Sequence, residues 1–388
     1  MAVEMQRPAL ADIEAGMIDL SFLPELSHPT DLRIPGPTPL PPAVVEAMRT
    51  PMVQGRSPQM SAFYLETLRL AREMHRTDGE VLIWAGTGSA GWEIPIVNLL
   101  EPGDPVLAMV NGDFGDRFAK AGTALGLTVN RVDVPWGQAV TQEDLRTALA
   151  AYPEVKAVFL THNETSTGVT NPVPELTRIA HDAGAMVFLD SVSGVGAIPL
   201  EMDAWDVDVV LSGSQKAWMC PPGLTIMAFS PKTLVRGEAL EGRGFARYFF
   251  DLATSRDAAR DGSTATTMPL TLIYAFRTAL ELLAAEGLDA AWARHARLGA
   301  LTRERLTGLG LELFADPAYA SDSVTTFRTP AGFTATSLRD AIRDQSGIEI
   351  ATGQGPVKDS VNRVGHLGWV HDTEMLRAFD AIGETLRG

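Results

Sequence analysis

Two charged side chains stand directly behind apolar segments that are typical of buried strands. Asp190 ends the run AMVFLD, and Lys216 follows the run VDVVLSG, 26 residues further along the chain. Apolar surroundings disfavour a charged ammonium group, so they lower the pKa of a lysine and make a neutral, nucleophilic amine available. Each residue alone has a plainer reading, because a strand-end aspartate can be a helix cap and a lysine can reach solvent along its aliphatic stem.

A glycine-rich turn lies upstream of both residues. The apolar run VLIWA leads into GTGSAG (86–91), which has the spacing G-x-G-x-x-G. As a dinucleotide site, its glycines would let the backbone approach a pyrophosphate, with Asp113 as the acidic residue expected about 20 residues later. The turn could instead hold a single phosphate on backbone N–H groups and the Ser89 hydroxyl, or be only a tight connection.

A further cation, Arg363, opens a short apolar stretch near the C-terminus. Its guanidinium could bind a carboxylate through two parallel hydrogen bonds, although alone it would be read as a surface ion-pair residue. A phosphate cup, an aspartate and a lysine at successive strand ends, and this arginine are together the parts of an enzyme that uses pyridoxal 5'-phosphate. The alternative from a different class is an NAD-dependent dehydrogenase built on residues 86–91, which has no need of the aspartate and lysine pair.

The elements that must position these residues alternate between strand and helix over residues 80–230. We expect strands at VLIWA, PVLAMV, KAVFLTH, AMVFLD, VDVVLSG and LTIMAFS, with helical patterns between them. This alternation predicts an α/β fold with a mostly parallel, doubly wound sheet, and the near-continuous apolar runs predict strands covered on both faces. Ligands of such sheets bind outside the carboxyl ends of the strands, where Asp190 and Lys216 fall.

The chain divides into three segments. We expect an N-terminal arm over residues 1–34, a large cofactor-binding domain over 35–267 and a smaller C-terminal α+β domain over 268–388. The large domain opens with the proline-rich stretch IPGPTPLPP, which is extended or turn-like because proline fixes φ. The smaller domain begins with two long helical patterns and continues with strands and helices in alternation.

Charge and composition exclude several kinds of partner. The formal net charge is −16, so nucleic acid and anionic membrane surfaces would be repelled. No run approaches the ~18 uninterrupted apolar residues of a membrane span, and the N-terminus has no basic segment followed by an apolar one. Cys220 is the single cysteine, which is typical of a reducing compartment. We therefore expect a cytoplasmic enzyme that binds neither nucleic acid nor membrane.

Taken together, these motifs make the sequence resemble class V, fold-type I aminotransferases, and specifically the alanine–glyoxylate and serine–glyoxylate aminotransferase family. The matching segments run in the family's order from about residue 33 to the C-terminus. They are PGPTPLPP, TGSAGWE, LEPGDPVL, VNGDFGDRF, THNETSTGV, FLDSVSGVG, SGSQKAWMCPPG and NRVGHLG. The most specific part is SGSQKA with PPG behind it and LDSV upstream.

The resemblance implies a role for each matching residue. Lys216 would be catalytic, holding the cofactor covalently and then carrying a proton between substrate and cofactor carbons. Arg363 would bind the substrate α-carboxylate, with Gly36 beside the substrate. The implied cofactor contacts are Ser89, Ala90 and Gly91 at the phosphate, Phe114 stacked on the ring, Thr165 near the ring hydroxyl, Asp190 at the ring nitrogen, Gln215 at the phosphate, Lys216, and Thr267 from the neighbouring subunit of a homodimer. No metal is implied.

The expected reaction moves an amino group from a small amino acid, alanine or serine, to a small 2-oxo acid, glyoxylate or pyruvate, with ping-pong kinetics. One obvious arginine for the substrate favours monocarboxylic over dicarboxylic amino acids. An (S)-ureidoglycine–glyoxylate aminotransferase is an alternative within the family, and an inactive binding protein is a third reading that the retained lysine, aspartate and arginine oppose.

Three residues depart from the pattern of the family: Thr264, Gly55, and Trp92, which is larger than the residue expected there. Thr264 stands where a tyrosine is common and Gly55 where a histidine is common, so they bear on phosphate contacts and on the substrate pocket. A cysteine desulfurase would share the fold but would need a mobile nucleophilic cysteine. We interpret Cys220, four residues after Lys216, as a small packing residue.

Overall fold

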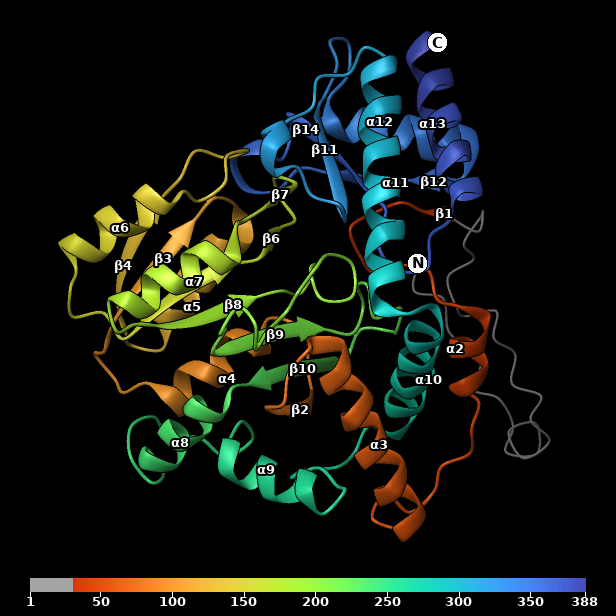
Figure 1. The fold of residues 1–388 in the computed structure, drawn as a ribbon. Coiled ribbons are helices and arrows are strands. Elements are labelled where there is room, and N and C mark those ends of the chain that lie inside the picture. The colour runs from red at the N-terminus through yellow and green to blue at the C-terminus, as the bar shows by residue number, and fades with distance from the viewer. Residues whose placement is uncertain (1–30) are drawn as a thin grey trace, which may run out of the picture.

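A seven-stranded sheet forms the centre of the larger part of the molecule (Figure 1). The computed structural model describes residues 31–388, so most of the expected N-terminal arm lies outside the described residues. The strand order is β2-β10-β9-β8-β5-β3-β4, and only β10 runs antiparallel to its neighbours. The strands are β2 (Glu80–Ala85), β3 (Pro105–Val110), β4 (Thr128–Asp133), β5 (Ala157–Thr161), β8 (Met186–Asp190), β9 (Val209–Gly213) and β10 (Leu224–Phe229). The predicted α/β fold with a mostly parallel sheet is confirmed.

Helices cover both faces of this sheet. Helices α4 and α5 pack side by side, as do α6 and α7. The two pairs lie on opposite faces, because right-handed crossovers that run in opposite directions along a sheet place their helices on opposite sides. The helices of the larger part are α2 (Pro42–Ala47), α3 (Pro58–His75), α4 (Ala90–Leu99), α5 (Asp113–Ala124), α6 (Gln142–Ala151), α7 (Val173–Asp182), α8 (Pro231–Ala239), α9 (Leu252–Arg260) and α10 (Leu270–Glu286).

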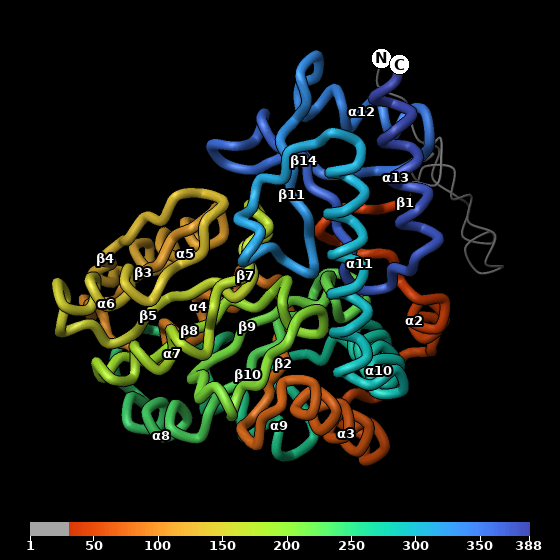
Figure 2. The backbone as a smooth tube through the Cα atoms, turned by 45° about the horizontal axis from the view of Figure 1, so that its top comes forward, coloured from red at the N-terminus to blue at the C-terminus, as the bar shows by residue number. Residues whose placement is uncertain are grey.

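The smaller part is built on a three-stranded antiparallel sheet in the order β11-β14-β13. The long helix α11 runs from the end of α10 to this sheet (Figure 2). A two-residue strand, β1 (Asp31–Leu32), pairs with β12 and so ties the start of the described chain to the smaller part. The elements are α11 (Leu288–Gly308), β11 (Val324–Arg328), α12 (Ala335–Ser346), β12 (Ile348–Glu349), β13 (Ala351–Thr352), β14 (Val361–Gly365) and α13 (Asp372–Arg387).

Helix α10 packs with the larger part. It lies against α2 and α3, and its buried side chains, among them Ile273, Phe276 and Leu280, belong to the core of the seven-stranded sheet. A separate core begins at Leu298, in the middle of α11. The division at residues 267 and 268 therefore stays a proposal, and the packing favours a border about 30 residues later, within α11.

The third glycine of the GTGSAG turn has a packing role. A methyl group on Gly91 would lie 3.0 Å from Cβ of Leu211, so glycine lets the first turn of α4 rest directly on β9. Proline at position 95 lies inside the same helix, and almost every residue of α4 beyond its first is buried. The turn thus fixes the N-terminus of a buried helix at the carboxyl ends of β8 and β9.

Four aromatic rings form a ladder through the core beneath this helix. Phe118 of α5 stacks on Phe159 of β5 with ring centroids 4.2 Å apart, and Phe159 continues to Phe188 of β8 at 5.8 Å. Trp92 of α4 also stacks on Phe118, with ring centroids 6.1 Å apart. Offset stacked rings add to the stability gained by burying their area. The ladder therefore joins two helices to the centre of the sheet.

Removing the middle ring of the ladder should destabilise the protein. We expect Phe159→Ala to lower the free energy of unfolding by about 3–5 kcal/mol, because it leaves a cavity between two stacked partners. Urea unfolding followed by circular dichroism measures this change. Val235→Ala, at a position 65% exposed on α8, is the control and should change it by less than about 0.5 kcal/mol. Equal effects of the two substitutions would contradict the prediction.

Candidate active site

Lys216 lies in a buried turn just beyond the end of β9. Its Nζ donates a hydrogen bond to the Pro35 carbonyl at 2.6 Å, and Oγ1 of Thr38 donates to the Lys216 carbonyl at 2.9 Å. Gly36 has φ of +132°, and a methyl group there would lie 2.6 Å from Cδ of Lys216. The strap over residues 35–38 therefore closes on the lysine, and only glycine fits at position 36.

Burial sets the proton affinity of this lysine. Loss of hydration and, to a smaller degree, the positive charge of Arg363 lower the pKa of Lys216 to about 8, while the charge of Asp190 opposes that change. A neutral amine is thus available within the physiological range, which agrees with what the apolar run before Lys216 indicated.

Asp190 ends β8 with its carboxylate almost completely buried. Oδ1 accepts a hydrogen bond from the backbone N–H of Val192 at 3.0 Å, and Oδ2 accepts one from Nε1 of Trp92 at 2.7 Å. Burial raises the pKa of Asp190, whereas the two N–H donors and the charge of Lys216 lower it. The carboxylate is therefore fixed in orientation by donors from two different elements.

The turn before α4 can bind a phosphate. The N–H groups of Ala90 and Gly91 donate to the carbonyls of Thr87 and Gly88, at 2.9 and 3.0 Å. The donors that precede this bonded turn, the N–H groups of Gly88 and Ser89, are the ones a helix N-terminus offers to an anion. The phosphate contacts predicted for Ala90 and Gly91 stay a proposal. The hydrogen bonding favours the N–H groups of Gly88 and Ser89 as the donors to the phosphate.

Gln215 lies next to this turn. A methyl group on Gly213 would lie 2.9 Å from Oε1 of Gln215 and 3.2 Å from the backbone nitrogen of Gly88, so the side-chain amide and that N–H flank one point. Oε1 of Gln215 is buried, and no residue in the range 31–388 gives it a hydrogen bond. A buried amide without a partner beside a helix N-terminus is a site that a polar ligand would complete.

Phe114 is the second residue of α5. Its backbone N–H and that of Gly115 both donate to Oε2 of Glu164, at 3.1 Å each. Oε1 of Glu164 accepts from the N–H and the hydroxyl of Ser166, at 3.0 and 2.6 Å. Burial raises the pKa of Glu164 to about 7, although the donors of Ser166 and the N–H of Gly115 oppose that change. This carboxylate caps α5 and so fixes the position of the Phe114 ring.

Arg363 projects from β14 of the smaller part into the same region. Its Nε donates to the Thr352 carbonyl at 2.8 Å, and its Nη1 donates to the Thr165 carbonyl and to Oε1 of Gln354, at 3.2 and 3.0 Å. All three acceptors are neutral oxygens, and burial lowers the pKa of Arg363 to about 10. A buried guanidinium whose partners are neutral is suited to bind an anion through Nη2.

These side chains meet in one cavity of about 270 Å³ between the two parts of the molecule. The lining includes five of the predicted residues: Gly36, Phe114, Thr165, Lys216 and Arg363. Thr267 is exposed just before α10 and does not line the cavity, so a single chain does not bring it to the site. Glu164 and Gln354 were not predicted from the sequence. Each contributes through a contact with another residue, Glu164 with the backbone of Phe114 and Gln354 with Arg363, and no sequence motif marks such a contact.

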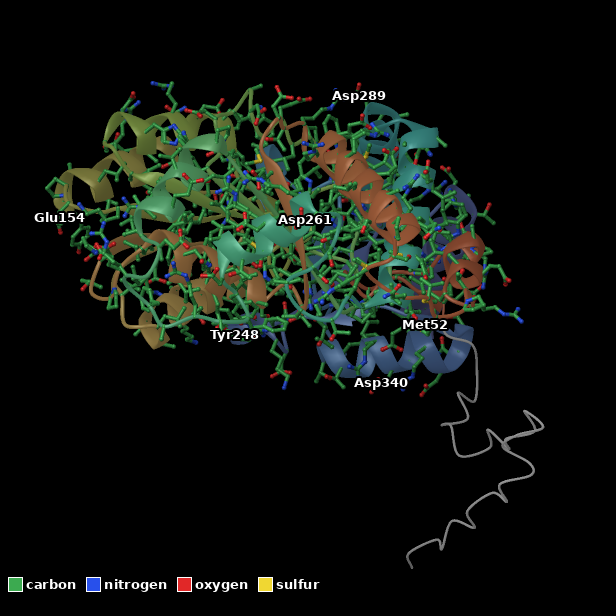
Figure 3. All side chains as sticks on the ribbon, turned by 90° about the horizontal axis from the view of Figure 1, so that it is seen from below. Met52, Glu154, Tyr248, Asp261, Asp289 and Asp340 are labelled. Atoms are coloured by element: carbon green, nitrogen blue, oxygen red, sulfur yellow. The ribbon has the colours of Figure 1, made fainter. Side chains whose placement is uncertain are left out.

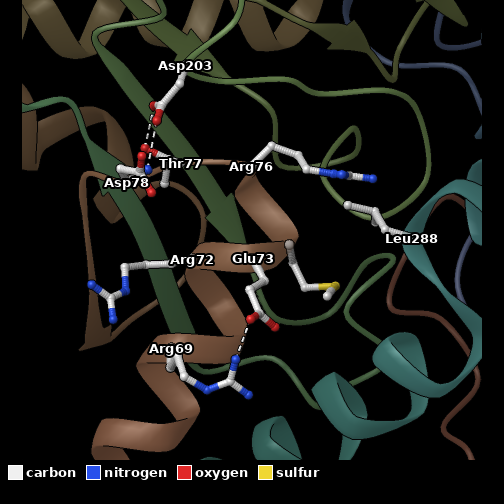
Figure 4. Close-up of a pocket in the computed structure, with 9 residues that line it drawn as sticks. Arg69, Arg72, Glu73, Arg76, Thr77, Asp78, Asp203 and Leu288 are labelled. Carbon is white, nitrogen blue, oxygen red and sulfur yellow. Dashed lines mark hydrogen bonds and ion pairs between the residues drawn. The ribbon is translucent and has the colours of Figure 1, made fainter.

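A larger hollow of about 740 Å³ lies elsewhere, beside the amino end of β2 (Figure 4). Its walls carry three arginines, Arg69, Arg72 and Arg76; Arg69 pairs with the wall residue Glu73, and Arg76 pairs with Asp289, which is not part of the lining. None of the candidate catalytic residues lines it. Parallel strands present their ligand sites at the carboxyl ends, so the smaller cavity around Lys216 is the candidate active site.

Two further observations concern the described residues 31–388. No helix in that range is both long and apolar enough to cross a bilayer, and no three His, Cys, Asp or Glu side chains are grouped as a metal site. Cys220 is buried, and burial raises the pKa of its thiol to about 12. A thiol held in this way packs against its neighbours and is not an activated nucleophile.

The fold and the site define a pyridoxal phosphate-dependent enzyme. Each part of the site fits one part of that cofactor. The lysine with a lowered pKa fits the amine-reactive carbon, and the buried aspartate at a neighbouring strand end fits the ring nitrogen. The aromatic wall fits the ring face, and the incomplete phosphate cup fits the phosphate. The aminotransferase class-V family profile matches residues 32–378. The chain therefore belongs to the class-V aminotransferases and is a transaminase that uses pyridoxal phosphate.

Several named proteins are similar to this chain over most of its length. The serine–glyoxylate aminotransferase of Hyphomicrobium methylovorum is 38% identical, over 88% of this chain and 85% of its own. The L-aspartate–glyoxylate aminotransferase of Paracoccus denitrificans is 37% identical, over 88% and 87%. A protein of Synechococcus sp. named as the small subunit of a soluble hydrogenase is also 37% identical, over 92% of both chains.

Among solved structures, the alanine–glyoxylate aminotransferase of Nostoc sp. superimposes with a TM-score of 0.90 at 30% identity, covering 98% of this chain and 100% of its own. The shared fold therefore extends through both parts of the molecule and is not limited to the cofactor-binding sheet.

The lowered proton affinity of Lys216 can be measured directly. We expect an amine-acylating reagent to modify Lys216 of the cofactor-free protein with a half-maximal rate near pH 8, well below the value of about 10.4 for an ordinary lysine. Mass spectrometry of the peptide that contains Lys216 gives the rate at each pH, and Lys216→Arg identifies that peptide by its loss. A rate that keeps rising beyond pH 10 would contradict the assignment.

Proposed function

We propose that this enzyme transfers an amino group from a small monocarboxylic amino acid, alanine or serine, to glyoxylate or pyruvate. The observation that carries this proposal is the placement of Arg363 and Lys216 in one cavity of about 270 Å³, where the guanidinium has only neutral partners. A cavity of this size suits a substrate of a few heavy atoms held by its carboxylate. The names of the similar glyoxylate aminotransferases support the same choice of acceptor.

Each residue would contribute a separate part of the reaction. Arg363 would hold the α-carboxylate through Nη2, and through Nη1 once Gln354 gives up the position that its Oε1 occupies. Lys216, as a neutral amine, would take the proton from the substrate Cα and return it to the cofactor side, a role of general acid–base catalysis. Asp190 would keep the ring nitrogen protonated. The cofactor itself supplies the electron sink that makes the Cα proton acidic.

A second candidate function follows from Arg339. This arginine lines the same cavity and could hold a second carboxylate, as an aspartate–glyoxylate aminotransferase requires. It was not expected from the sequence, which offered one obvious arginine for the substrate. However, Arg339 pairs with Asp340 at 2.7 Å and approaches Glu349 at 3.7 Å, so its charge is largely balanced before any ligand arrives. The geometry therefore favours a monocarboxylic donor.

Mixing the enzyme with single amino donors tests these assignments. We expect alanine or serine to remove the visible absorbance of the bound cofactor within one turnover, and aspartate to act at least about ten times more slowly. Arg363→Leu should lower kcat/KM for the preferred donor about 10–100-fold, because a charged hydrogen bond worth 1.5–3 kcal/mol is lost. Lys216→Ala should abolish covalent cofactor attachment. Faster turnover with aspartate would establish the second candidate, and reaction with ureidoglycine alone would establish the alternative within the family.

We also propose that the enzyme is a homodimer whose active sites are completed across the interface. Apolar side chains are exposed on the single chain, among them Met52, which is 64% exposed, and Tyr248, which is 92% exposed; Figure 3 labels both at the surface. A partner chain that covered these side chains would remove their apolar area from water. Thr267 is exposed and stands away from its own cavity, so it could serve the site of a second copy.

Mixed dimers of two impaired variants test this arrangement. Lys216→Ala alone and Thr267→Val alone should each have low activity. If Thr267 acts across the interface, a dimer that contains one subunit of each kind has one complete site, made from the lysine of one subunit and the threonine of the other. We expect refolded mixtures to recover up to about half the native activity per such dimer. No recovery beyond the sum of the separate variants would place Thr267 in its own subunit's site.

We propose a cytoplasmic location for the enzyme, as the composition predicts. The single cysteine is buried and the chain is strongly acidic, which supports a reducing compartment and no association with nucleic acid.

A further inference from the structure

Trp92 makes a contact that the reaction as described does not use. Its Nε1 donates to Oδ2 of Asp190 at 2.7 Å, across 98 residues of sequence, and both side chains are buried. The other carboxylate oxygen is held by the Val192 N–H at 3.0 Å. The bulk of Trp92, which sets this chain apart from the expected pattern, thus brings a hydrogen-bond donor to the residue assigned to the ring nitrogen.

The aromatic ladder holds this donor in place. The Trp92 ring stacks on Phe118 with an interplanar angle of 22°, and Phe118 is itself stacked on Phe159. Rotation of the indole would break this stacking and would expose buried apolar area, so the N–H stays directed at Asp190. The donor is therefore preorganised by the core, and not by the cofactor.

We propose that Trp92 is a positioning residue, whose indole N–H keeps the Asp190 carboxylate ionised and directed at the cofactor ring nitrogen. The proposal rests on the role that the proposed function gives to Asp190. An ionised carboxylate oxygen can accept more than one hydrogen bond, so Oδ1 or Oδ2 can receive the ring N–H while Val192 and Trp92 remain bound. Without the indole donor, burial would favour the neutral acid, which could no longer stabilise a protonated ring.

Trp92→Phe removes the donor and keeps an aromatic ring in the ladder. We expect this variant to bind pyridoxal phosphate about 10–100-fold more weakly than the native protein, the range for a hydrogen bond to a charged group. Equilibrium dialysis of the cofactor-free protein measures the dissociation constant without any amino donor. The matched control is Trp84→Phe, because Nε1 of Trp84 is also buried but bonds to nothing among residues 31–388. The control should change the constant less than about twofold.

The pH dependence separates positioning from mere packing. Loss of the indole donor raises the pKa of Asp190, so a larger fraction of the variant is protonated at low pH. The ratio of the variant and native dissociation constants should therefore grow as the pH falls from 8 to 5. A ratio that stays constant over this range would show a packing defect and overturn the proposal.

A double substitution tests whether Trp92 acts through Asp190. In an Asp190→Asn background, adding Trp92→Phe should weaken cofactor binding less than about twofold further, whereas an undiminished loss would overturn the proposal. Phe118→Leu keeps the indole N–H of Trp92 but loosens the packing of the Trp92 ring, and it replaces Trp92→Phe in the test if that variant does not fold. It should weaken cofactor binding less than Trp92→Phe does, and it should lose this effect in the Asp190→Asn background. These dissociation constants are measured without an amino donor, so they stay valid even if the proposed amino donor is wrong. An Asp190→Asn variant that binds pyridoxal phosphate normally would refute the role of Asp190 itself.

Discussion

The need to satisfy one buried carboxylate organises the whole active site. Glu164 lies at zero exposure, and its oxygens can be satisfied only by donors that reach it inside the protein. It draws on the first turn of α5 and on Ser166, which fixes the loop over residues 163–168. That loop in turn presents the Thr165 carbonyl to Arg363, and Asn163 bonds to the hydroxyls of Ser193 and Ser323. The start of α5 at Phe114, the guanidinium of Arg363 and the joint between the two parts of the molecule therefore share one support.

The charges of the site balance each other without forming direct pairs. Lys216 and Arg363 are basic groups, Asp190 and Glu164 are acidic groups, and each is held by neutral groups or by backbone. Direct ion pairs would neutralise the groups that the proposed function assigns to the substrate and the cofactor. Burial is the main cause of the lowered pKa of Lys216, and at this separation the charge of Arg363 lowers that pKa further while the charge of Asp190 raises it.

The sequence predicts much of this arrangement, and the reasons for its failures are physical. Apolar runs located six strands of the central sheet, and Phe114 and Lys216, which follow two of these runs, line the cavity. Strand β4 was missed because it is an edge strand with exposed or half-exposed residues in every position, so it lacks an apolar run. Ser57 caps the N-terminus of α3, because its side chain accepts a hydrogen bond from the N–H of Met60. This contact is local and gave no signal of function. The contacts of Glu164, Trp92 and Gln354 could not be read from a linear chain, because they depend on register and on side-chain direction.

The two walls of the cavity differ in how far they could be changed. The side around Lys216 is fixed by the strap at Gly36, where even one added carbon would collide with Lys216. The wall formed by Ile350, Ala351, Thr352 and Gln354 belongs to short strands and a loop of the smaller part, and its Thr352 carbonyl and Gln354 side chain hold Arg363. Substrate range can thus be redesigned at Ile350 and Ala351, which give the Arg363 guanidinium no hydrogen bond, while the contacts of Lys216 stay intact. Separation of this kind explains in structural terms how one scaffold can serve different amino donors.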